Sequence, residues 1–143
     1  MRSEDIKYVI IQAGGKGIRM GRYAENKPKC LVPVKGIPMI MNTIEKYKDK
    51  EIIIIADYKA DVLETYLSNF CKYNFTVCQT SEQGTAGGLG KVVDSIPDDE
   101  PFVLTWADLF FEDTPEFEFN KDLLVGLSNS FKCRWKLENN KFV

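Results

Sequence analysis

Short apolar runs alternate with longer amphipathic stretches over most of the chain. A short continuous apolar run is typical of a buried strand, and apolar residues that recur every three or four positions are typical of a helix. The predicted strands are 6–11, 52–56, 75–78 and 102–105, and the predicted helices are 38–46, 60–71 and 85–96. This alternation indicates an α/β fold, with a Rossmann-like, mostly parallel sheet that carries helices on both faces.

The pattern is less regular after residue 110. Residues 110–122 are acidic and aromatic, and the simplest interpretation is a surface excursion. Two more strands are predicted at 123–127 and 131–137, and residues 138–141 have the composition of a hairpin turn. A chain of 143 residues fits a single domain with a sizeable core.

A glycine-rich, basic segment follows the first predicted strand. Gly14, Gly15 and Gly17 come where that strand ends, and ligands of parallel sheets bind outside the carboxyl ends of the strands. Glycine lets the backbone turn tightly and leaves N–H groups free to point at an anion. Residues 16–29 hold five basic side chains and one acid, on a chain whose net charge is −2. Such a loop indicates a polyphosphate ligand rather than a nucleic-acid surface.

Two other interpretations of this loop stay open. A plain tight turn would also use glycine. A dinucleotide-binding loop is the second alternative, but Met20 stands where that motif has its third glycine. Asp57, which follows the second predicted strand, lies too far along the chain to hold a ribose in the usual way. Arg19 and the Lys-Pro-Lys segment at 27–29 favour a nucleoside triphosphate over both.

A second cluster, Gln79 and the glycine-rich run 84–90, follows the third predicted strand. Gly87, Gly88 and Gly90 fall inside the predicted helix, where each costs about 0.8–1 kcal/mol relative to alanine. Either tight packing of the helix on the sheet or a ligand pressed against the backbone would compensate for this cost. Both interpretations stay open.

Asp108 is the third candidate feature. It comes shortly after the predicted strand 102–105, behind Trp106 and Ala107. A carboxylate at the carboxyl end of a central parallel strand is well placed to hold Mg²⁺ against phosphate oxygens. Taken alone, a helix-capping or surface aspartate is the commoner role.

Composition excludes several classes of function. The chain has no histidine, which excludes Ser-His-Asp and Cys-His catalysis and a histidine general base. Its four cysteines form no C-x-x-C pair, so we expect reduced thiols and no zinc site. No apolar run reaches membrane-spanning length, and residues 1–7 lack the apolar centre of a signal peptide. We therefore expect a cytoplasmic protein with no membrane partner.

Four motifs in register resemble the sugar-1-phosphate nucleotidyltransferase family, and their order and approximate spacing match over nearly the whole chain. Two departures stand out: Ile18 replaces the usual threonine, and Ala107 replaces a glycine, which adds a methyl where an acceptor could sit. The motifs are Gly14-Gly15-Lys16-Gly17-Ile18-Arg19, the stretch from Pro28 to Met39, Gly84-Thr85-Ala86, and Ala107-Asp108.

The resemblance implies that three side chains act on the reacting phosphates. Arg19 would bind the departing pyrophosphate, and Lys29 would contact the phosphates at the reacting centre. Asp108 would bind Mg²⁺, the one cofactor that the resemblance implies. Trp106 would lie nearby, on the acceptor side.

The resemblance also implies how the nucleotide is held. Backbone amides of the first loop would wrap the triphosphate, and the second cluster would meet the base. The residues implied to wrap the triphosphate are Gly14, Gly15 and Gly17, and those implied to meet the base are Gln79 and Gly84. Ala13 and Thr85 are implied to bind the nucleotide as well.

The implied fold is a nucleotidyltransferase (GT-A-like) fold, formed by residues 1–143 as one domain. Its nucleotide-binding part would cover about 6–110, and the start of an acceptor lobe about 111–143. In the family, a lysine segment and a second metal-binding aspartate follow the hairpin, and neither is found before residue 143. We therefore expect the acceptor lobe to be incomplete.

The expected reaction transfers a nucleoside monophosphate from a nucleoside triphosphate to a phosphorylated small molecule. With a sugar 1-phosphate as acceptor, the products would be an NDP-sugar and pyrophosphate. Three alternatives stay open: a cytidylyltransferase acting on a non-sugar phosphate such as phosphocholine, a nucleotide-binding module without catalysis, and a dinucleotide-dependent oxidoreductase. No nucleic-acid partner is expected, and a homo-oligomer is left open.

Overall fold

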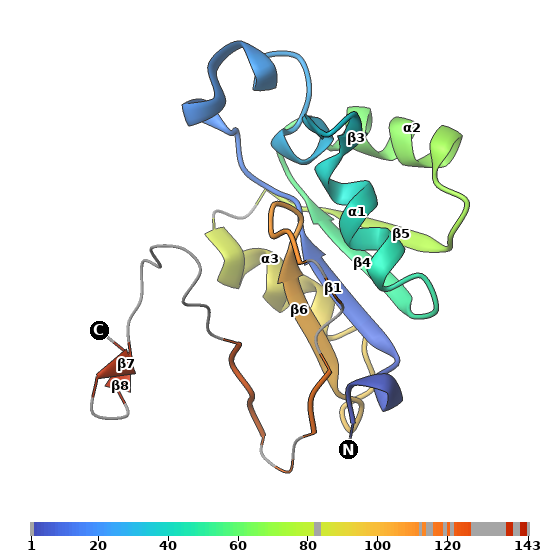
Figure 1. Cartoon of the computed structure of the whole chain (residues 1–143), viewed down its shortest axis with the longest axis vertical. Coiled ribbons are helices and arrows are strands. Elements are labelled where there is room, and N and C mark those ends of the chain that lie inside the picture. The colour runs from blue at the N-terminus through green and yellow to red at the C-terminus, as the bar shows by residue number, and fades with distance from the viewer. Residues whose placement is uncertain are drawn as a thin grey trace.

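A four-stranded parallel sheet forms the centre of the structure, with strand order β5-β4-β1-β6 (Figure 1). The computed structural model of the chain describes residues 2–81, 84–111, 113, 116–118, 120, 122–126, 137–138 and 141–142. The strands are β1 (Tyr8–Gln12), β4 (Glu51–Ala56), β5 (Phe75–Gln79) and β6 (Phe102–Trp106). β1 and β4 each pair with a neighbour on both sides, so they are the two central strands of the sheet.

Helices cover both faces of this sheet (Figure 1). α1 (Met39–Lys46) and α2 (Ala60–Phe70) lie on one face, and α3 (Gly84–Val93) lies on the other. Val9 and Ile11 pack in the core with α1 and α2, whereas Tyr8 and Ile10 pack with α3. Covering on both sides explains why β1 is apolar at successive positions. In the part of the chain that the structure describes, no helix is long and apolar enough to cross a membrane. The predicted α/β fold class is confirmed.

The seven strands and helices predicted before residue 110 are all present, and their ends differ from the predictions by at most three residues. The largest difference is in α3, which ends at Val93 rather than at residue 96. Ser95 and Ile96 donate their backbone N–H groups to carbonyls only three residues earlier. The backbone therefore forms tighter turns after α3, without the hydrogen bonds of an α-helix. Because the apolar spacing continues through these turns, the sequence pattern predicted a longer helix.

The hydrophobic pattern does not predict several short elements. They include a two-stranded hairpin of β2 (Pro33–Val34) and β3 (Ile37–Pro38). Its two connecting residues, Lys35 and Gly36, have φ angles of 52° and 82°. Positive φ at both positions is typical of a type I′ turn, which matches the twist of the paired strands. The other short elements are the 3₁₀ turns η1 (Ser3–Asp5), η2 (Ile18–Ala24) and η3 (Lys29–Leu31).

The end of the chain follows the predictions only in part. The strand predicted at 123–127 is wrong over residues 123–126, which form no strand. Leu123, Leu124 and Val125 are exposed, and an apolar run becomes a strand only where a neighbouring strand takes up its N–H and C=O groups. Of the strand predicted at 131–137, residues 131–136 lie outside the described residues. The predicted hairpin is confirmed, because β7 (Leu137–Glu138) pairs antiparallel with β8 (Lys141–Phe142).

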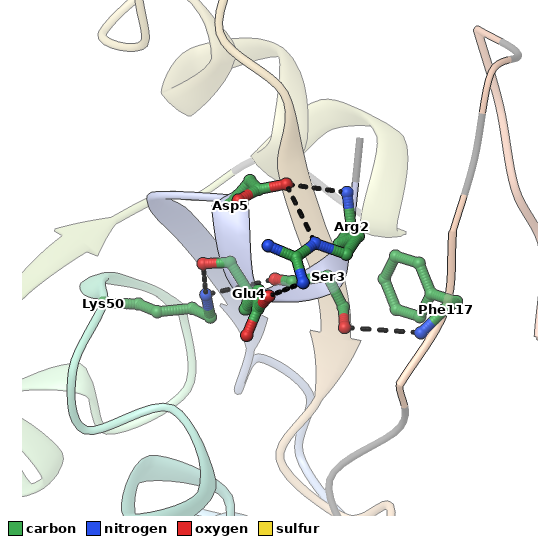
Figure 2. Close-up of polar contacts among 6 residues, drawn as sticks. All are labelled: Arg2, Ser3, Glu4, Asp5, Lys50 and Phe117. Carbon is green, nitrogen blue, oxygen red and sulfur yellow. Dashed lines mark hydrogen bonds and ion pairs between the residues drawn. The ribbon is translucent and has the colours of Figure 1, made fainter.

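The N-terminal turn joins three segments at the amino edge of the sheet (Figure 2). Lys50, just before β4, donates hydrogen bonds from Nζ to the carbonyls of Ser3, Glu4 and Ile6 at 3.2, 3.4 and 2.5 Å. Ser3 donates its backbone N–H to the Phe117 carbonyl at 2.8 Å, and Phe117 donates its own N–H to the Ser3 hydroxyl. The described residues of the predicted surface excursion 110–122 are exposed or half-buried, as predicted. The bonds between Ser3 and Phe117 tie this segment back to the N-terminus.

Two glycines inside α3 have different surroundings. A Cβ atom built on Gly88 would lie 2.8 Å from Cγ2 of Ile55, which is buried in β4. A Cβ atom built on Gly90 would meet nothing within 4 Å. Close packing of α3 on the sheet therefore explains Gly88, whereas nothing in the structure explains Gly90.

This difference predicts opposite effects of the same substitution at two sites in one helix. Gly88→Ala forces a methyl against Ile55, and we expect it to lower the free energy of unfolding by about 1–3 kcal/mol. Gly90→Ala only improves helix propensity, and we expect it to raise that free energy by about 1 kcal/mol. Thermal unfolding of the two variants measures both, as a midpoint several degrees below and above that of the parent chain. Equal shifts in one direction would contradict the packing account.

Candidate functional site

The candidate site lies at the carboxyl edge of the sheet, between β1 and β6. After β1 the chain adds β4 and β5 on one side, and it then returns to add β6 on the other side of β1. The loops that leave β1 and β6 therefore diverge at the point where the strand order reverses. In open α/β sheets this point is where ligands bind.

Backbone hydrogen bonds fix where these loops leave the sheet. Ala13 donates its N–H to the Ile55 carbonyl at 2.8 Å, and Ala107 donates its N–H to the Gln12 carbonyl at 3.0 Å. The parallel ladders thus continue one residue beyond the strands on both sides of β1. Asp108 is the next residue after this anchor, so its position relative to the first loop is set by the sheet.

The glycine-rich loop requires glycine at two of its positions. Gly15 and Gly17 have φ angles of 103° and 60°, in the region that side chains rarely adopt. A Cβ atom on Gly17 would also lie 3.0 Å from the Lys29 Cβ and 3.2 Å from the Ala24 Cβ. Gly17 therefore allows η2 and η3 to approach each other, which brings Lys29 beside the loop.

Lys29 is held at the base and exposed at the tip. The next two residues of η3, Cys30 and Leu31, are buried in the core with α1 and α2. The Lys29 side chain is 38% exposed, and its Nζ lies 2.5 Å from Oδ2 of Asp108, whose side chain is 39% exposed. These two residues are 79 positions apart in the sequence. The structure thus joins two predicted site residues in an ion pair, which the sequence did not predict.

Three other predicted residues, Gly14, Arg19 and Trp106, lie on the segment that follows β1 or at the end of β6. Gly14 is close to Asp57, which follows β4: a Cβ atom on Gly14 would lie 3.6 Å from the Asp57 Cβ. Arg19 projects from η2 and is exposed. Trp106, at the end of β6, is partly exposed, whereas Ala107 is buried with the core. The Ala107 methyl therefore packs against protein in this structure.

Gln79, one of the predicted base-binding residues, lies two strands away from β1. Gln79 is exposed at the end of β5, and β4 separates β5 from β1. Two strand spacings amount to about 10 Å. Gly84 and Thr85 lie in the first turn of α3, on the opposite face of the sheet from α1 (Figure 1). The structure therefore groups the glycine loop, Lys29 and Asp108, and it leaves Gln79 at a distance from them.

Sequence reasoning missed two supporting residues. Asp57 was considered only as a ribose ligand, yet it lies directly beside Gly14. Tyr58 donates a hydrogen bond from its hydroxyl to the Glu25 carbonyl at 3.0 Å, which supports the end of η2. Both residues could have been assigned to the site because they directly follow β4, and the carboxyl ends of neighbouring parallel strands share one edge of the sheet.

Asp108 is chemically suited to be the single protein ligand of a Mg²⁺ ion. Its carboxylate supplies the oxygen donors that this cation prefers. Among the residues that the structure describes, no group of three or more Cys, Asp or Glu side chains could hold a metal ion. Because Mg²⁺ commonly takes one or two carboxylates together with substrate phosphates, the donor set fits a cation that shares its ligands with a polyphosphate.

A separate cavity of about 730 Å³ lies at the amino edge of the sheet, among η1, the turn before β4 and residues 116–118. It is at the opposite end of the strands from the glycine loop. Two of its three lining cations, Arg2 and Lys50, are engaged by Glu4 and by backbone carbonyls respectively (Figure 2). These contacts stabilise the N-terminal turn.

Comparisons with known proteins agree with this geometry. A family model described as the MobA-like NTP transferase domain matches residues 9–116. The chain is similar to the bifunctional protein GlmU of Methanocaldococcus jannaschii, with 36% identity over 116 residues, 78% of this chain and 27% of that protein. It is also similar to glucose-1-phosphate cytidylyltransferase of Salmonella typhimurium, with 27% identity over 69% of this chain and 49% of that protein.

A solved structure is similar in three dimensions. HddC from Yersinia pseudotuberculosis, complexed with GMP-PN, matches with a TM-score of 0.60 and 25% identity, over 72% of this chain and 48% of that one. The chain thus spans about a quarter to a half of the length of the proteins it matches.

The thiol of Cys30 provides a test of how η3 is packed. Burial raises the pKa of Cys30 from 9.0 to about 12, and the negative charge of Asp108 adds to this effect. In the unfolded chain the thiol ionises near pH 9, while the folded chain keeps it protonated. The stabilisation that the buried neutral thiol contributes is therefore complete below pH 9 and is lost as the pH rises toward 12.

We expect the free energy of unfolding to fall more steeply between pH 9 and 12 in the parent chain than in Cys30→Ala. Urea unfolding at a series of pH values measures both slopes. Cys71→Ala, at a half-buried thiol, is the control and should keep the parent slope. Parallel curves for the parent chain and Cys30→Ala would show that Cys30 is not buried as described.

Proposed function

Because this chain belongs to the MobA-like NTP transferase domain family, we propose that it binds a nucleoside triphosphate at the carboxyl edge of its sheet. The complete protein then transfers the nucleoside monophosphate to a phosphorylated acceptor, for which we propose a sugar 1-phosphate. The observation that carries the proposal is the meeting of the glycine loop, Lys29 and Asp108 at the reversal of strand order.

The triphosphate binds to the first loop in this proposal. Backbone N–H groups from Gly14 to Gly17 meet its oxygens, since the positive φ angles of Gly15 and Gly17 turn the backbone without strain. Ala13, whose N–H is bonded to the Ile55 carbonyl, anchors the start of this loop to the sheet. Arg19, exposed on η2, binds the pyrophosphate portion, where a planar guanidinium can donate two hydrogen bonds. Lys29 neutralises the phosphate at the reacting centre.

The base lies over the far strands in this proposal. Gln79 at the end of β5, with Gly84 and Thr85 at the start of α3, forms its binding site. The spacing of about 10 Å between β5 and β1 leaves room for the ribose between base and phosphates. An exposed amide side chain can donate and accept hydrogen bonds, as base recognition requires.

The chemistry needs alignment and charge neutralisation. An oxygen of the acceptor phosphate attacks the α-phosphorus as the bond to pyrophosphate breaks, in line with the attacking atom. No general base is needed, because that phosphate is already ionised at neutral pH, and the absence of histidine is no obstacle. Lys29 and Arg19 offset the charge of the two anionic reactants. Mg²⁺ bound to Asp108 would supply further neutralisation of the phosphate oxygens.

The proposed organisation follows the sequence analysis. Residues 6–110 form the nucleotide-binding part, and residues 111–143 begin the acceptor lobe of a single nucleotidyltransferase domain. A cytoplasmic location is also part of the proposal, and the free thiols of Cys30, Cys71 and Cys78 support it.

Selective binding of one nucleoside triphosphate tests the proposal. The purified chain is heated with ATP, GTP, CTP, UTP or dTTP, each with Mg²⁺. A ligand at 100 times its dissociation constant stabilises by about 2.7 kcal/mol, which raises the midpoint by several degrees. A shift with one or two of these nucleotides is expected, and NAD⁺ is the control. A shift with NAD⁺ alone, or with none, contradicts the proposal.

Arg19→Ala tests whether the pyrophosphate portion of the bound nucleotide lies at Arg19. Loss of charge-assisted hydrogen bonds to the pyrophosphate portion should weaken binding of the preferred triphosphate by about tenfold or more. Binding of the matching monophosphate should stay unchanged, because the monophosphate lacks that portion. Isothermal titration measures both affinities. Arg22→Ala, an exposed arginine of the same 3₁₀ turn, is the control with the smaller expected effect. An equal loss for both nucleotides would contradict this assignment of Arg19.

A further inference from the structure

We propose that the Lys29–Asp108 ion pair keeps the metal-binding carboxylate occupied until a polyphosphate arrives, so that the divalent cation enters together with the nucleotide. This inference rests on the proposed function for its nucleotide half. Its metal half rests on the proposed Mg²⁺ role of Asp108 and can be measured without a nucleotide.

The ammonium group of Lys29 is bound to one of the two carboxylate oxygens that Asp108 could offer to a cation. Its Nζ lies 2.5 Å from Oδ2 of Asp108. Mg²⁺ binds carboxylate oxygens at about 2.0–2.1 Å. A cation on the same oxygen would therefore lie within about 4.6 Å of Nζ, where like charges repel strongly. Binding of the metal alone therefore either displaces Lys29 from its partner or sets two cations against each other on one carboxylate.

The described part of the protein supplies few further ligands for the cation. Among the described residues, no cluster of three acidic or thiol side chains stands ready to complete its coordination. Mg²⁺ demands a nearly octahedral set of oxygens and gives up its waters reluctantly. One carboxylate that is already paired is therefore a poor site for the free ion.

A polyphosphate removes both obstacles. The backbone of Lys29 is fixed beside the glycine loop, because the Lys29 Cβ lies close to Gly17 and Cys30 is buried below it. Above this fixed base, a flexible four-carbon stem can turn the ammonium from Asp108 to a phosphate in the loop without backbone movement. Transfer of Lys29 to the phosphate frees Asp108, and the phosphate oxygens supply the missing ligands of the cation.

Such an exchange couples the two ligands by linkage. If the polyphosphate raises the affinity for the cation, the cation raises the affinity for the polyphosphate by the same factor. The pair also predicts an effect in the absence of metal. Removal of the Asp108 charge releases Lys29, so metal-free binding of a polyphosphate should improve rather than weaken.

The first experiment measures Mn²⁺ binding to the nucleotide-free chain, from the electron paramagnetic resonance signal of the unbound ion. The parent chain should bind Mn²⁺ weakly, and Lys29→Met should bind it at least tenfold more tightly. Lys27→Met removes the same charge two residues away and should change the affinity less than threefold. Adding Asp108→Asn to Lys29→Met should abolish the gain. A similar gain from Lys27→Met, no gain from Lys29→Met, or a gain that survives Asp108→Asn would each overturn the inference.

The second experiment titrates inorganic triphosphate in EDTA, which avoids dependence on the base. Asp108→Asn should bind it severalfold more tightly than the parent chain, and Asp57→Asn, the neighbouring carboxylate after β4, is the control with the smaller change. Weaker binding by Asp108→Asn would overturn the inference. If neither chain binds triphosphate, the proposed function fails, while the Mn²⁺ experiment still decides whether Lys29 and the cation compete. Thermal unfolding without ligand establishes that each variant is folded.

Discussion

The parallel pairing of β1 with both β4 and β6 is the constraint on which the rest of the structure depends. Because both ladders run in the same direction, the carboxyl ends of the three strands meet at one edge. Val9, Ile10 and Ile11 are fully buried, so the strand cannot slip in register without exposing its apolar side chains on both faces. The loop after β1 and the residue Asp108 after β6 are placed relative to each other by this pairing.

The charges at that edge are arranged as a balanced pair within a basic surrounding. Lys29 and Asp108 neutralise each other, while the nearby segment 16–29 carries an excess of positive charge. Side chains that are about two-fifths exposed gain little net stability from such a pair. The contact therefore contributes little to stability, and it leaves an ammonium group and a carboxylate at this edge for the roles proposed above.

Much of the fold and of the candidate site could be predicted because the relevant signals are local. Apolar periods gave the strands and helices around the core, and the rule for parallel sheets identified Gly14 and Asp108 as edge residues. The strand predicted at 123–127 failed because a strand needs a partner, which composition does not supply. The turn at Lys35 escaped prediction because a lysine with positive φ carries no local signature. Gly88 had two open explanations, and only its distance to Ile55 selected packing.

By itself, the sequence determined the fold class, the order of the elements and the types of residue at each strand end. These properties can be read from single segments, because the spacing of apolar residues and the backbone preferences of glycine and proline are local. Only the tertiary structure decided which of these residues meet. The pairing of Lys29 with Asp108 joins positions 79 residues apart, and it depends on the register of β1 with β6 and on the close approach that Gly17 allows. Neither the register nor the close approach can be predicted from one segment, because both arise from the packing of distant segments against each other.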